Sequence, residues 1–308
     1  RSMTNPLFDG LLATGRTTPD KCFAILPDGR EFTYADVEAV SARFANALVA
    51  LGVEPGDRVA VQADKSIEAL MLYLGTVRAG GVFLPLNTAY TPTEIDYFLN
   101  DAKPRVFVCD PAKRDGLAAT AEGAGARLET LGARATDAGS LNAQADAASG
   151  EFVTVARQPS DLAAILYTSG TTGRSKGAML TQDNLLSNAE VLRDYWRFTA
   201  DDVLLHLLPI FHTHGLFVAS NTAMIAGGTM IFLPKFDVEQ VFKYLPQATA
   251  MMGVPTFYTR LLADERLNRE RTAHMRLFTS GSAPLLAETH RAFEERTGQR
   301  ILERYGMT

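Results

Sequence analysis

The chain alternates short apolar runs with longer segments in which apolar residues recur every three to four positions. In the first third, the apolar runs predict strands at 57–63, 82–87 and 104–110, and the amphipathic segments predict helices at 66–80 and 91–102. Such regular alternation of strand and helix favours a sheet of parallel strands with helices on its faces.

A different pattern precedes these units. Residues 23–34, FAILPDGREFTY, predict a β-hairpin whose turn is formed by Asp28 and Gly29. A helix that begins near Thr33 is expected to run to Leu51.

The rhythm of strand and helix returns after a looser stretch. Residues 111–160 are rich in Ala, Gly, Asp and Thr, which predicts one or two peripheral helices, connecting loops and a seam between subdomains. We therefore expect an α/β fold of stacked, largely parallel sheets covered by helices, with two layers divided near this stretch. The later strands are expected at 162–167, 203–208, 229–233, 249–254, 275–279 and 300–303, and the later helices at 181–196, 215–226, 237–245, 255–263 and 285–297.

Composition narrows the functional classes. The 308 residues are 46% hydrophobic and 21% charged, which is typical of soluble globular proteins. A net charge of -5 argues against nucleic-acid binding, which usually needs a basic patch. No apolar stretch reaches transmembrane length and no secretory signal is recognisable, so we expect a cytoplasmic protein without a membrane partner. Arg1 and Ser2 precede Met3 and are interpreted as an expression scar.

Two cysteines, Cys22 and Cys109, lie in strand-like contexts and are expected to be buried thiols. The sequence has no CxxC pair and no mixed Cys/His cluster, so no metal ligands are expected within the chain.

A loop dense in glycine and hydroxyl residues follows the predicted strand at 162–167, in the stretch YTSGTTGRSKGAML. Ligands of open parallel sheets bind beyond the carboxyl ends of the strands. Glycines at Gly170, Gly173 and Gly177 let the backbone take positive φ values and approach a ligand closely. Backbone amides and hydroxyls of such a loop can form an anion-binding nest, to which Lys176 adds a positive charge. The loop is therefore predicted to bind a polyphosphate.

A P-loop NTPase is the obvious alternative, but the spacing does not fit it. That motif needs glycine before the lysine and Ser or Thr after it, whereas Ser175 precedes Lys176 and Gly177 follows it. The residues GAML then predict a strand, with Thr181 as the cap of the next helix. A plain surface linker is also disfavoured, because linkers rarely lie between two apolar strands.

This loop resembles the phosphate-binding signature of the adenylate-forming superfamily, which includes acyl-CoA synthetases, adenylation domains of peptide synthetases and luciferases. Other motifs resemble that superfamily in the same order: LPIFHTHG at 208–215 resembles the acyl-pocket motif, GVPTFYTRLL at 253–262 the following strand and helix, SGSAPL at 280–285 the adenine-side turn, and ERYGMT at 303–308 the motif that receives adenine and the α-phosphate. Within the superfamily the chain looks most like a malonyl-CoA synthetase, over essentially its whole length after Met3.

The resemblance implies an acid–thiol ligase. A carboxylate would attack the α-phosphate of ATP to give an acyl-adenylate and pyrophosphate, and coenzyme A would then displace AMP. ATP, Mg²⁺ and coenzyme A are the cofactor and cosubstrates that this chemistry implies. By the same resemblance the ATP phosphates are bound by Thr168, Ser169, Gly170, Thr171, Thr172, Gly173, Lys176 and Thr308, with Lys176 and Thr308 also acting in catalysis.

The resemblance places adenine between the turn of Ser282, Ala283 and Pro284 on one side and Tyr305 with Gly306 on the other.

Two histidines, His212 and His214, lie in the acyl-pocket motif. A metal site is disfavoured because no third ligand is nearby, and a buried structural histidine is the common alternative. The resemblance assigns His212 to the reacting carboxylate as a catalytic orienter, with His214 in support. His206, His274 and His290 are given no role.

The second carboxylate of a dicarboxylic substrate needs a partner, because an unpaired buried charge is costly and arginine pairs with carboxylates in a bidentate way. Thr256 and Arg260 are i and i+4 on a predicted helix and share one face. The resemblance assigns Arg260 and Ser282, with His212, to the carboxylates of malonate or methylmalonate.

The same resemblance indicates what the chain lacks. Residues 4–308 correspond to most of a large N-terminal AMP-binding domain, whereas family members continue with a magnesium-binding glutamate, a hinge and a small C-terminal domain that carries a lysine needed for adenylation. The enzyme is therefore expected to be the parent protein, with the missing C-terminal domain as its partner. The isolated chain is expected to be inactive or weakly active.

Two other functions stay open at this point. A ligase for a short monocarboxylic or aryl acid predicts that Arg260 points to solvent. A nucleotide-binding module without turnover predicts ATP binding without pyrophosphate exchange.

Overall fold

The structure, a computed structural model, describes residues 4–133, 137–168 and 175–304. The chain forms two compact units, and each unit is made of two separate segments of the chain. The expected seam at 111–160 lies inside unit 1. Unit 1 comprises Arg1–Ala13 and Ala35–Ser187, and unit 2 comprises Thr14–Tyr34 and Asn188–Thr308.

The sheet of unit 1 has the strand order β6-β5-β3-β4-β7-β8. All neighbours are parallel except β7 and β8, which pair antiparallel. Five of these strands agree with the sequence prediction, and β6 was not predicted. The strands are β3 (Arg58–Gln62), β4 (Val82–Pro85), β5 (Val106–Cys109), β6 (Arg127–Thr130), β7 (Leu162–Tyr167) and β8 (Gly177–Thr181).

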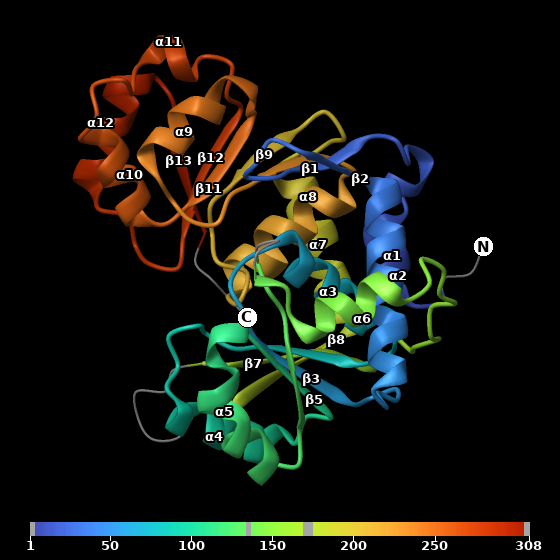
Figure 1. The fold of residues 1–308 in the computed structure, drawn as a ribbon. Coiled ribbons are helices and arrows are strands. Elements are labelled where there is room, and N and C mark those ends of the chain that lie inside the picture. Colours follow the sequence, from blue (N-terminus) through green and yellow to red (C-terminus); the bar gives the residue numbers. More distant parts are fainter. Residues whose placement is uncertain (1–3, 134–136, 169–174, 305–308) are drawn as a thin grey trace. The chain divides into compact units, whose positions relative to one another are not determined.

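Helices α4 and α5 cover one face of this sheet (Figure 1). Pro92 opens α4 and a reciprocal pair of hydrogen bonds between Thr91 and Glu94 caps it, which is why the helix begins there. Its apolar side buries Phe98, whose ring centre lies 4.6 Å from that of Tyr167 at the end of β7. The helices of unit 1 are α1 (Pro6–Leu12), α2 (Tyr34–Ala50), α3 (Ile67–Arg78), α4 (Pro92–Ala102), η2 (Pro111–Lys113), α5 (Arg114–Gly123) and α6 (Ser140–Ala147), and α7 (Gln182–Tyr195) runs on into unit 2.

The sheet of unit 2 has the strand order β13-β12-β11-β9-β10-β1-β2. It is parallel except for the β1–β2 hairpin, which the sequence predicted at 23–34. Together the two sheets confirm the expected α/β class of largely parallel sheets with helical covers. The strands are β1 (Cys22–Ile25), β2 (Glu31–Thr33), β9 (Val203–His206), β10 (Thr229–Phe232), β11 (Ala250–Gly253), β12 (Leu277–Gly281) and β13 (Ile301–Arg304).

Helices α9, α10 and α12 gather against one face of this second sheet (Figure 1). The shared core contains Tyr258, Phe278 and Phe293, whose rings meet edge to face at centroid distances of 5.0 to 5.4 Å. The helices of unit 2 are η1 (Gly15–Thr17), the π-helix η4 (His214–Ser220), α8 (Asn221–Ile225), α9 (Val238–Tyr244), η5 (Leu245–Gln247), α10 (Pro255–Leu262), α11 (Arg269–Thr272) and α12 (Ala287–Thr297).

Sheet topology indicates where each unit can bind a ligand. In the sheet of unit 2, β10 lies on one side of β9 and the next strand along the chain, β11, lies on its other side, so the order of strands reverses direction at β9. Such a reversal opens a crevice beyond the carboxyl ends of the strands. The segment after β9 and helix α10 after β11 both begin at this edge, and they carry His212 and Arg260.

Among the residues that the structure describes, no helix is long and apolar enough to cross a membrane. Cys109 is buried as expected, whereas Cys22 is only half-buried.

Candidate functional site

The ends of the predicted phosphate loop are held by antiparallel strands in unit 1. Thr168 follows β7 and Lys176 precedes β8, and both are exposed. Tyr97 donates a hydrogen bond of 2.9 Å to the Ser175 carbonyl, and the Ser175 hydroxyl donates to the Thr168 carbonyl. The described part of the loop therefore has the expected strand-loop-strand form. The predicted phosphate ligands Ser169, Gly170, Thr171, Thr172 and Gly173 lie outside the described residues.

Gly177 is needed for a reason that the sequence interpretation missed. We expected it to supply a positive φ, but it is not among the residues with positive φ. A Cβ at this position would lie 2.8 Å from the Cγ2 atom of Ile165 on the paired strand. Close packing between β7 and β8, rather than backbone conformation, accounts for the glycine.

In unit 2 the helix predicted for 215–226 is present, but its first part is the π-helix η4 (His214–Ser220), and only its second part, α8 (Asn221–Ile225), is an α-helix. His206 Nε2 lies 2.9 Å from both the Gly215 carbonyl oxygen and the Ser220 hydroxyl, and so fixes the start of this turn. A side chain at Gly215 would collide with the Pro209 carbonyl. His206 thus has a structural role, and the turn presents His214 at its first position. π-Helical turns frequently occur at functional sites.

His214 is the buried centre of the candidate acid site. Its Nδ1 atom forms a hydrogen bond of 3.1 Å with the hydroxyl of Ser282. Burial lowers the pKa of His214 to about 4, and the charges of His212 and Arg304 act in the same direction. The ring is therefore neutral at pH 7. The neighbouring His212 is exposed.

Ser282 and the two residues after it form an exposed turn beyond β12. Ser282 has a φ of +68°, a left-handed conformation that costs energy for a residue other than glycine. Ala283 and Pro284 are exposed, and the chain re-enters the core at Leu285. The strained serine thus presents its hydroxyl to His214. The other adenine-side residues, Tyr305 and Gly306, and the catalytic candidate Thr308 lie outside the described residues.

Arg260 lies on α10 as predicted, and its side chain is exposed. Its guanidinium carbon is 4.6 Å from the centre of the Phe236 ring, which stacks on Phe257 at 4.5 Å. This cation–π contact fixes one end of the side chain. Among the residues that the structure describes, no hydrogen bond joins Arg260 to Ser282 or His212, although the sequence predicts that all three bind the acid.

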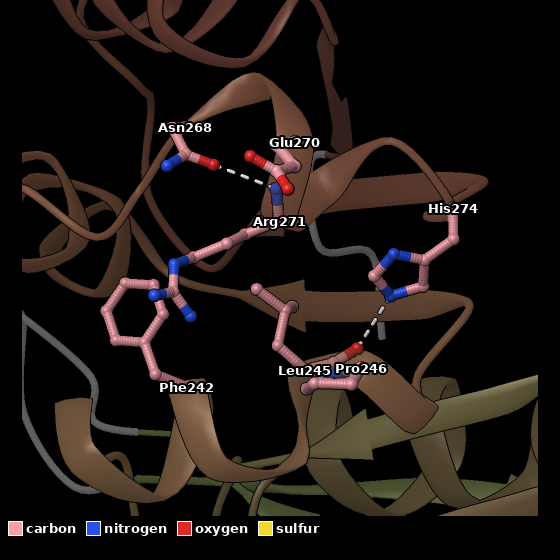
Figure 2. Close-up of a pocket in the computed structure, with 7 residues that line it drawn as sticks. All are labelled: Phe242, Leu245, Pro246, Asn268, Glu270, Arg271 and His274. Atoms are coloured by element: carbon pink, nitrogen blue, oxygen red, sulfur yellow. Dashed lines mark hydrogen bonds between the residues drawn. The ribbon is translucent and has the colours of Figure 1, made fainter.

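A pocket of about 430 Å³ lies elsewhere in unit 2 (Figure 2). It is formed by residues ahead of β11 and β12, near the amino ends of those strands, whereas the candidate acid site lies at their carboxyl ends. His274 at its rim donates from Nε2 to the Leu245 carbonyl at 2.7 Å, a structural bond. The pocket is lined by Phe242, Leu245, Pro246, Asn268, Glu270, Arg271 and His274.

No group of three or more His, Cys, Asp or Glu residues arranged to hold a metal ion occurs in 4–133, 137–168 and 175–304. The described residues give Mg²⁺ no such site, so we assign no step to the ion.

The family model described as AMP-binding enzyme matches residues 11–308. The chain belongs to the AMP-binding enzyme family. This confirms its recognition as a member of the adenylate-forming superfamily, most like a malonyl-CoA synthetase.

Solved structures and curated relatives of this AMP-binding enzyme agree on the fold. Apo MatB from Rhodopseudomonas palustris is 59% identical, with a TM-score of 0.95, over 99% of this chain and 60% of MatB. Malonate–CoA ligase of Arabidopsis thaliana is 29% identical over 92% of this chain and 53% of its own length. Feruloyl-CoA synthase of an Amycolatopsis species is 33% identical, with corresponding shares of 92% and 56%. The chain thus spans between half and two thirds of these relatives.

Two residues of the AMP-binding enzyme's candidate site have larger roles than we expected from the motifs. His214 was expected only to support His212, but it is the residue that contacts Ser282. Arg304, which ends β13, was given no role, yet it pairs with Gly281, the residue against which His214 packs. The signal that could have found it was a charged residue at the end of an apolar strand, in ILERYG.

Proposed function

We propose that the protein containing this chain is an ATP-dependent acid–CoA ligase that activates a small dicarboxylic acid, malonate or methylmalonate. The observation that carries the proposal is the 59% identity to MatB over 99% of the chain, in a family that also contains a malonate–CoA ligase. A solved structure of the same MatB is described as ATP-bound, which supports ATP as the nucleotide.

The proposed reaction overcomes the poor electrophilicity of a carboxylate. One carboxylate oxygen attacks the α-phosphorus of ATP, the bond to the bridging oxygen breaks, and pyrophosphate leaves with that electron pair. The thiolate of coenzyme A then attacks the acyl carbon and AMP leaves, carrying the carboxylate oxygen. Negative charge moves onto pyrophosphate in the first step, and preorganised donors and cations stabilise such charge.

Residues of this chain supply part of that environment in the proposal. Lys176, exposed at the end of the phosphate loop, carries a positive charge suited to the triphosphate, and Thr168 stands at the start of the loop. His212 and Ser282 orient the acid at the carboxyl edge of unit 2, with neutral His214 behind Ser282. Mg²⁺, when bound, would offset phosphate charge. Coenzyme A, Mg²⁺ and a cytoplasmic location remain predictions from the sequence.

Selectivity for a dicarboxylate is assigned to Arg260 in this proposal. A ligase for a monocarboxylic or aryl acid is the second candidate, and one observation favours it: Arg260 is exposed, as that alternative predicts. Feruloyl-CoA synthase, which is 33% identical to this chain, is named for an aryl acid and so agrees with this second candidate.

Pyrophosphate exchange distinguishes the two candidates. The full-length protein is incubated with ATP, labelled pyrophosphate and one acid at a time: malonate, methylmalonate, acetate, butyrate or ferulate. We expect exchange with malonate or methylmalonate to exceed that with every monocarboxylic acid. Equal or greater exchange with butyrate or ferulate would refute the dicarboxylate assignment and favour the second candidate.

A further inference from the structure

The phosphate loop leaves the sheet of unit 1 beyond the last paired residues of β7 and β8, Tyr167 and Gly177. Ser175 lies past this pair, so strand pairing no longer fixes its backbone. Lys176, the exposed cation that we assign to the triphosphate, directly follows Ser175. Because a lysine side chain is long and flexible, the direction in which it reaches depends on how firmly this short piece of backbone is held.

Two side chains of α4 bond to the two ends of the loop. The Tyr97 hydroxyl donates a hydrogen bond of 2.9 Å to the Ser175 carbonyl, and the Asp101 carboxylate accepts one of 2.6 Å from the Tyr167 hydroxyl. Tyr97 and Asp101 are i and i+4 on α4, so they lie on one side of the helix. Burial and the bond to Asp101 raise the pKa of Tyr167, so its hydroxyl keeps the proton that it donates. One side of α4 therefore holds the end of β7 and the residue that precedes Lys176.

Ring packing makes α4 a firm support for these bonds. The ring of Phe98, which is buried, has its centre 5.6 Å from that of Tyr97 and 4.6 Å from that of Tyr167. Aromatic contacts at such distances are favourable. The start of the helix is fixed as well, by the reciprocal bonds of Thr91 and Glu94. The Tyr97 ring is thus placed by packing, and its hydroxyl reaches the loop from a fixed position.

The Ser175 backbone is held from a second side by its own hydroxyl. That hydroxyl donates to the Thr168 carbonyl and so bridges the two ends of the loop. Ser175 therefore has one bond to α4 and one to the end of β7. Neither bond involves the side chain of Lys176, which is exposed. The arrangement fixes the backbone beside the cation and leaves its ammonium group to reach a ligand.

We propose that Tyr97 is a positioning residue for ATP, which holds the backbone at Ser175 so that Lys176 is directed to the phosphates. The inference rests on the proposed function and deepens it, since it names a residue outside the loop motif that prepares the loop. A backbone that is fixed before ATP binds loses less conformational entropy on binding, which makes binding tighter. Tyr97 acts through Lys176 in this account and does not itself touch ATP.

The test measures pyrophosphate exchange in the full-length protein with ATP varied at saturating malonate. Tyr97→Phe keeps the ring and removes only the hydroxyl, and loss of its hydrogen bond should raise the KM for ATP about three- to tenfold. Tyr90→Phe is the matched control, because the Tyr90 ring also packs on Phe98, at 4.9 Å, but its hydroxyl bonds to no residue that the structure describes. Its KM for ATP should stay within about twofold of the wild-type value.

The KM for malonate separates positioning at the loop from a general loss of activity. It should stay within about twofold in both variants, because the residues assigned to the acid lie in unit 2 and Tyr97 lies in unit 1. An unchanged KM for ATP in Tyr97→Phe would overturn the inference.

A double-mutant cycle with Lys176→Ala shows whether Tyr97 acts through the lysine. If it does, adding Tyr97→Phe to Lys176→Ala should change the KM for ATP by less than about 1.5-fold. A further rise as large as the one in the wild-type background would show that the hydroxyl acts independently of Lys176, and the inference would be wrong.

Thermal unfolding separates positioning from stability. We expect the melting temperature of Tyr97→Phe to fall by less than about 3 °C. A larger fall with a raised KM for both ATP and malonate, or a variant that does not fold, would show that Tyr97 chiefly stabilises unit 1, and this too would overturn the inference.

Outcomes for the two proposals are distinct. If the wild-type protein shows ATP-dependent exchange with malonate and Tyr97→Phe has the wild-type KM for ATP, the inference fails and the proposed function stands. If the wild-type protein prefers a monocarboxylic acid, the dicarboxylate assignment fails, and Tyr97 is tested with that acid instead. If no acid supports exchange, both proposals fail.

Discussion

Replacing Gly281 by alanine tests the geometry of the acid site. The added methyl carbon would lie 2.9 Å from His214 Cε1 and 3.1 Å from the Arg304 carbonyl oxygen. Ordinary carbon contacts begin near ~3.5 Å, so the buried imidazole must move by about 0.5 Å or more. A shift of that size weakens the 3.1 Å hydrogen bond between His214 and Ser282.

Overpacking of a well-packed interior costs about 1–3 kcal/mol, which sets the expected loss of unfolding free energy in Gly281→Ala. Gly116→Ala is the matched control, because Gly116 lies inside α5 and an added methyl carbon there would have no other atom within 4 Å. In a helix interior that change should add about 0.5–1 kcal/mol.

Urea unfolding followed by circular dichroism measures both changes in the full-length protein. Pyrophosphate exchange measures the KM for malonate, which should rise in Gly281→Ala and stay constant in Gly116→Ala. A Gly281→Ala variant with wild-type stability and wild-type malonate KM would show that His214 is not held against β12 as described.

Three further predictions concern pH, the loop and the fold. The pKa of His214 is about 4 in the folded protein and returns to its ordinary value on unfolding. The unfolded protein therefore binds more protons between these two values, so the free energy of unfolding is highest above about pH 6.5 and falls as the pH is lowered toward 4. Between pH 7.5 and 5 the wild-type protein should thus lose about 2 kcal/mol that His214→Gln does not lose, measured by urea unfolding. Lys176→Ala should raise the KM for ATP about tenfold or more in pyrophosphate exchange, and an unchanged KM contradicts the loop assignment. Arg276 donates to Asp202 at 2.9 Å and 3.1 Å, and Arg276→Met would leave this buried carboxylate without its cation. The free energy of unfolding, measured in a urea melt, should fall by about 3 kcal/mol. Replacing Arg300, whose ion pair with Glu294 is exposed, is the control and should lower it by less than about 0.5 kcal/mol.

Local elements followed closely from the sequence, because apolar periodicity reports which face of a segment is buried. The hairpin at 23–34 and the strand at 162–167 agree with β1, β2 and β7 to within one or two residues at each end. The partners of these elements are set by contacts far apart in the chain. β1 pairs with β10 about two hundred residues later, and no local pattern announces that pairing.

The π-helix at His214–Ser220 also depends on a contact that its own residues do not predict. An apolar segment with small residues predicts a helix, but the wider turn depends on His206, which bonds the Gly215 carbonyl from the end of β9. The residue that anchors the turn therefore lies outside the segment that forms it.

The candidate site was predictable where it rests on a motif. The phosphate loop, His212 and Ser282 come from contiguous motifs, and the described parts of them lie at strand ends as a binding site requires. Arg304 was missed because its position beside Gly281, and so near His214, depends on the pairing of β13 with β12, which a single sequence does not reveal.

The central claim is that the acid is activated as an adenylate, and an oxygen label tests it most directly. Malonate labelled with ¹⁸O in its carboxylates is converted by the full-length protein with ATP and coenzyme A, and the products are analysed by mass spectrometry. The account predicts malonyl-CoA together with AMP that carries one ¹⁸O atom, and unlabelled pyrophosphate. Release of ADP with the label in inorganic phosphate would contradict it, because the acid would then be activated as an acyl phosphate.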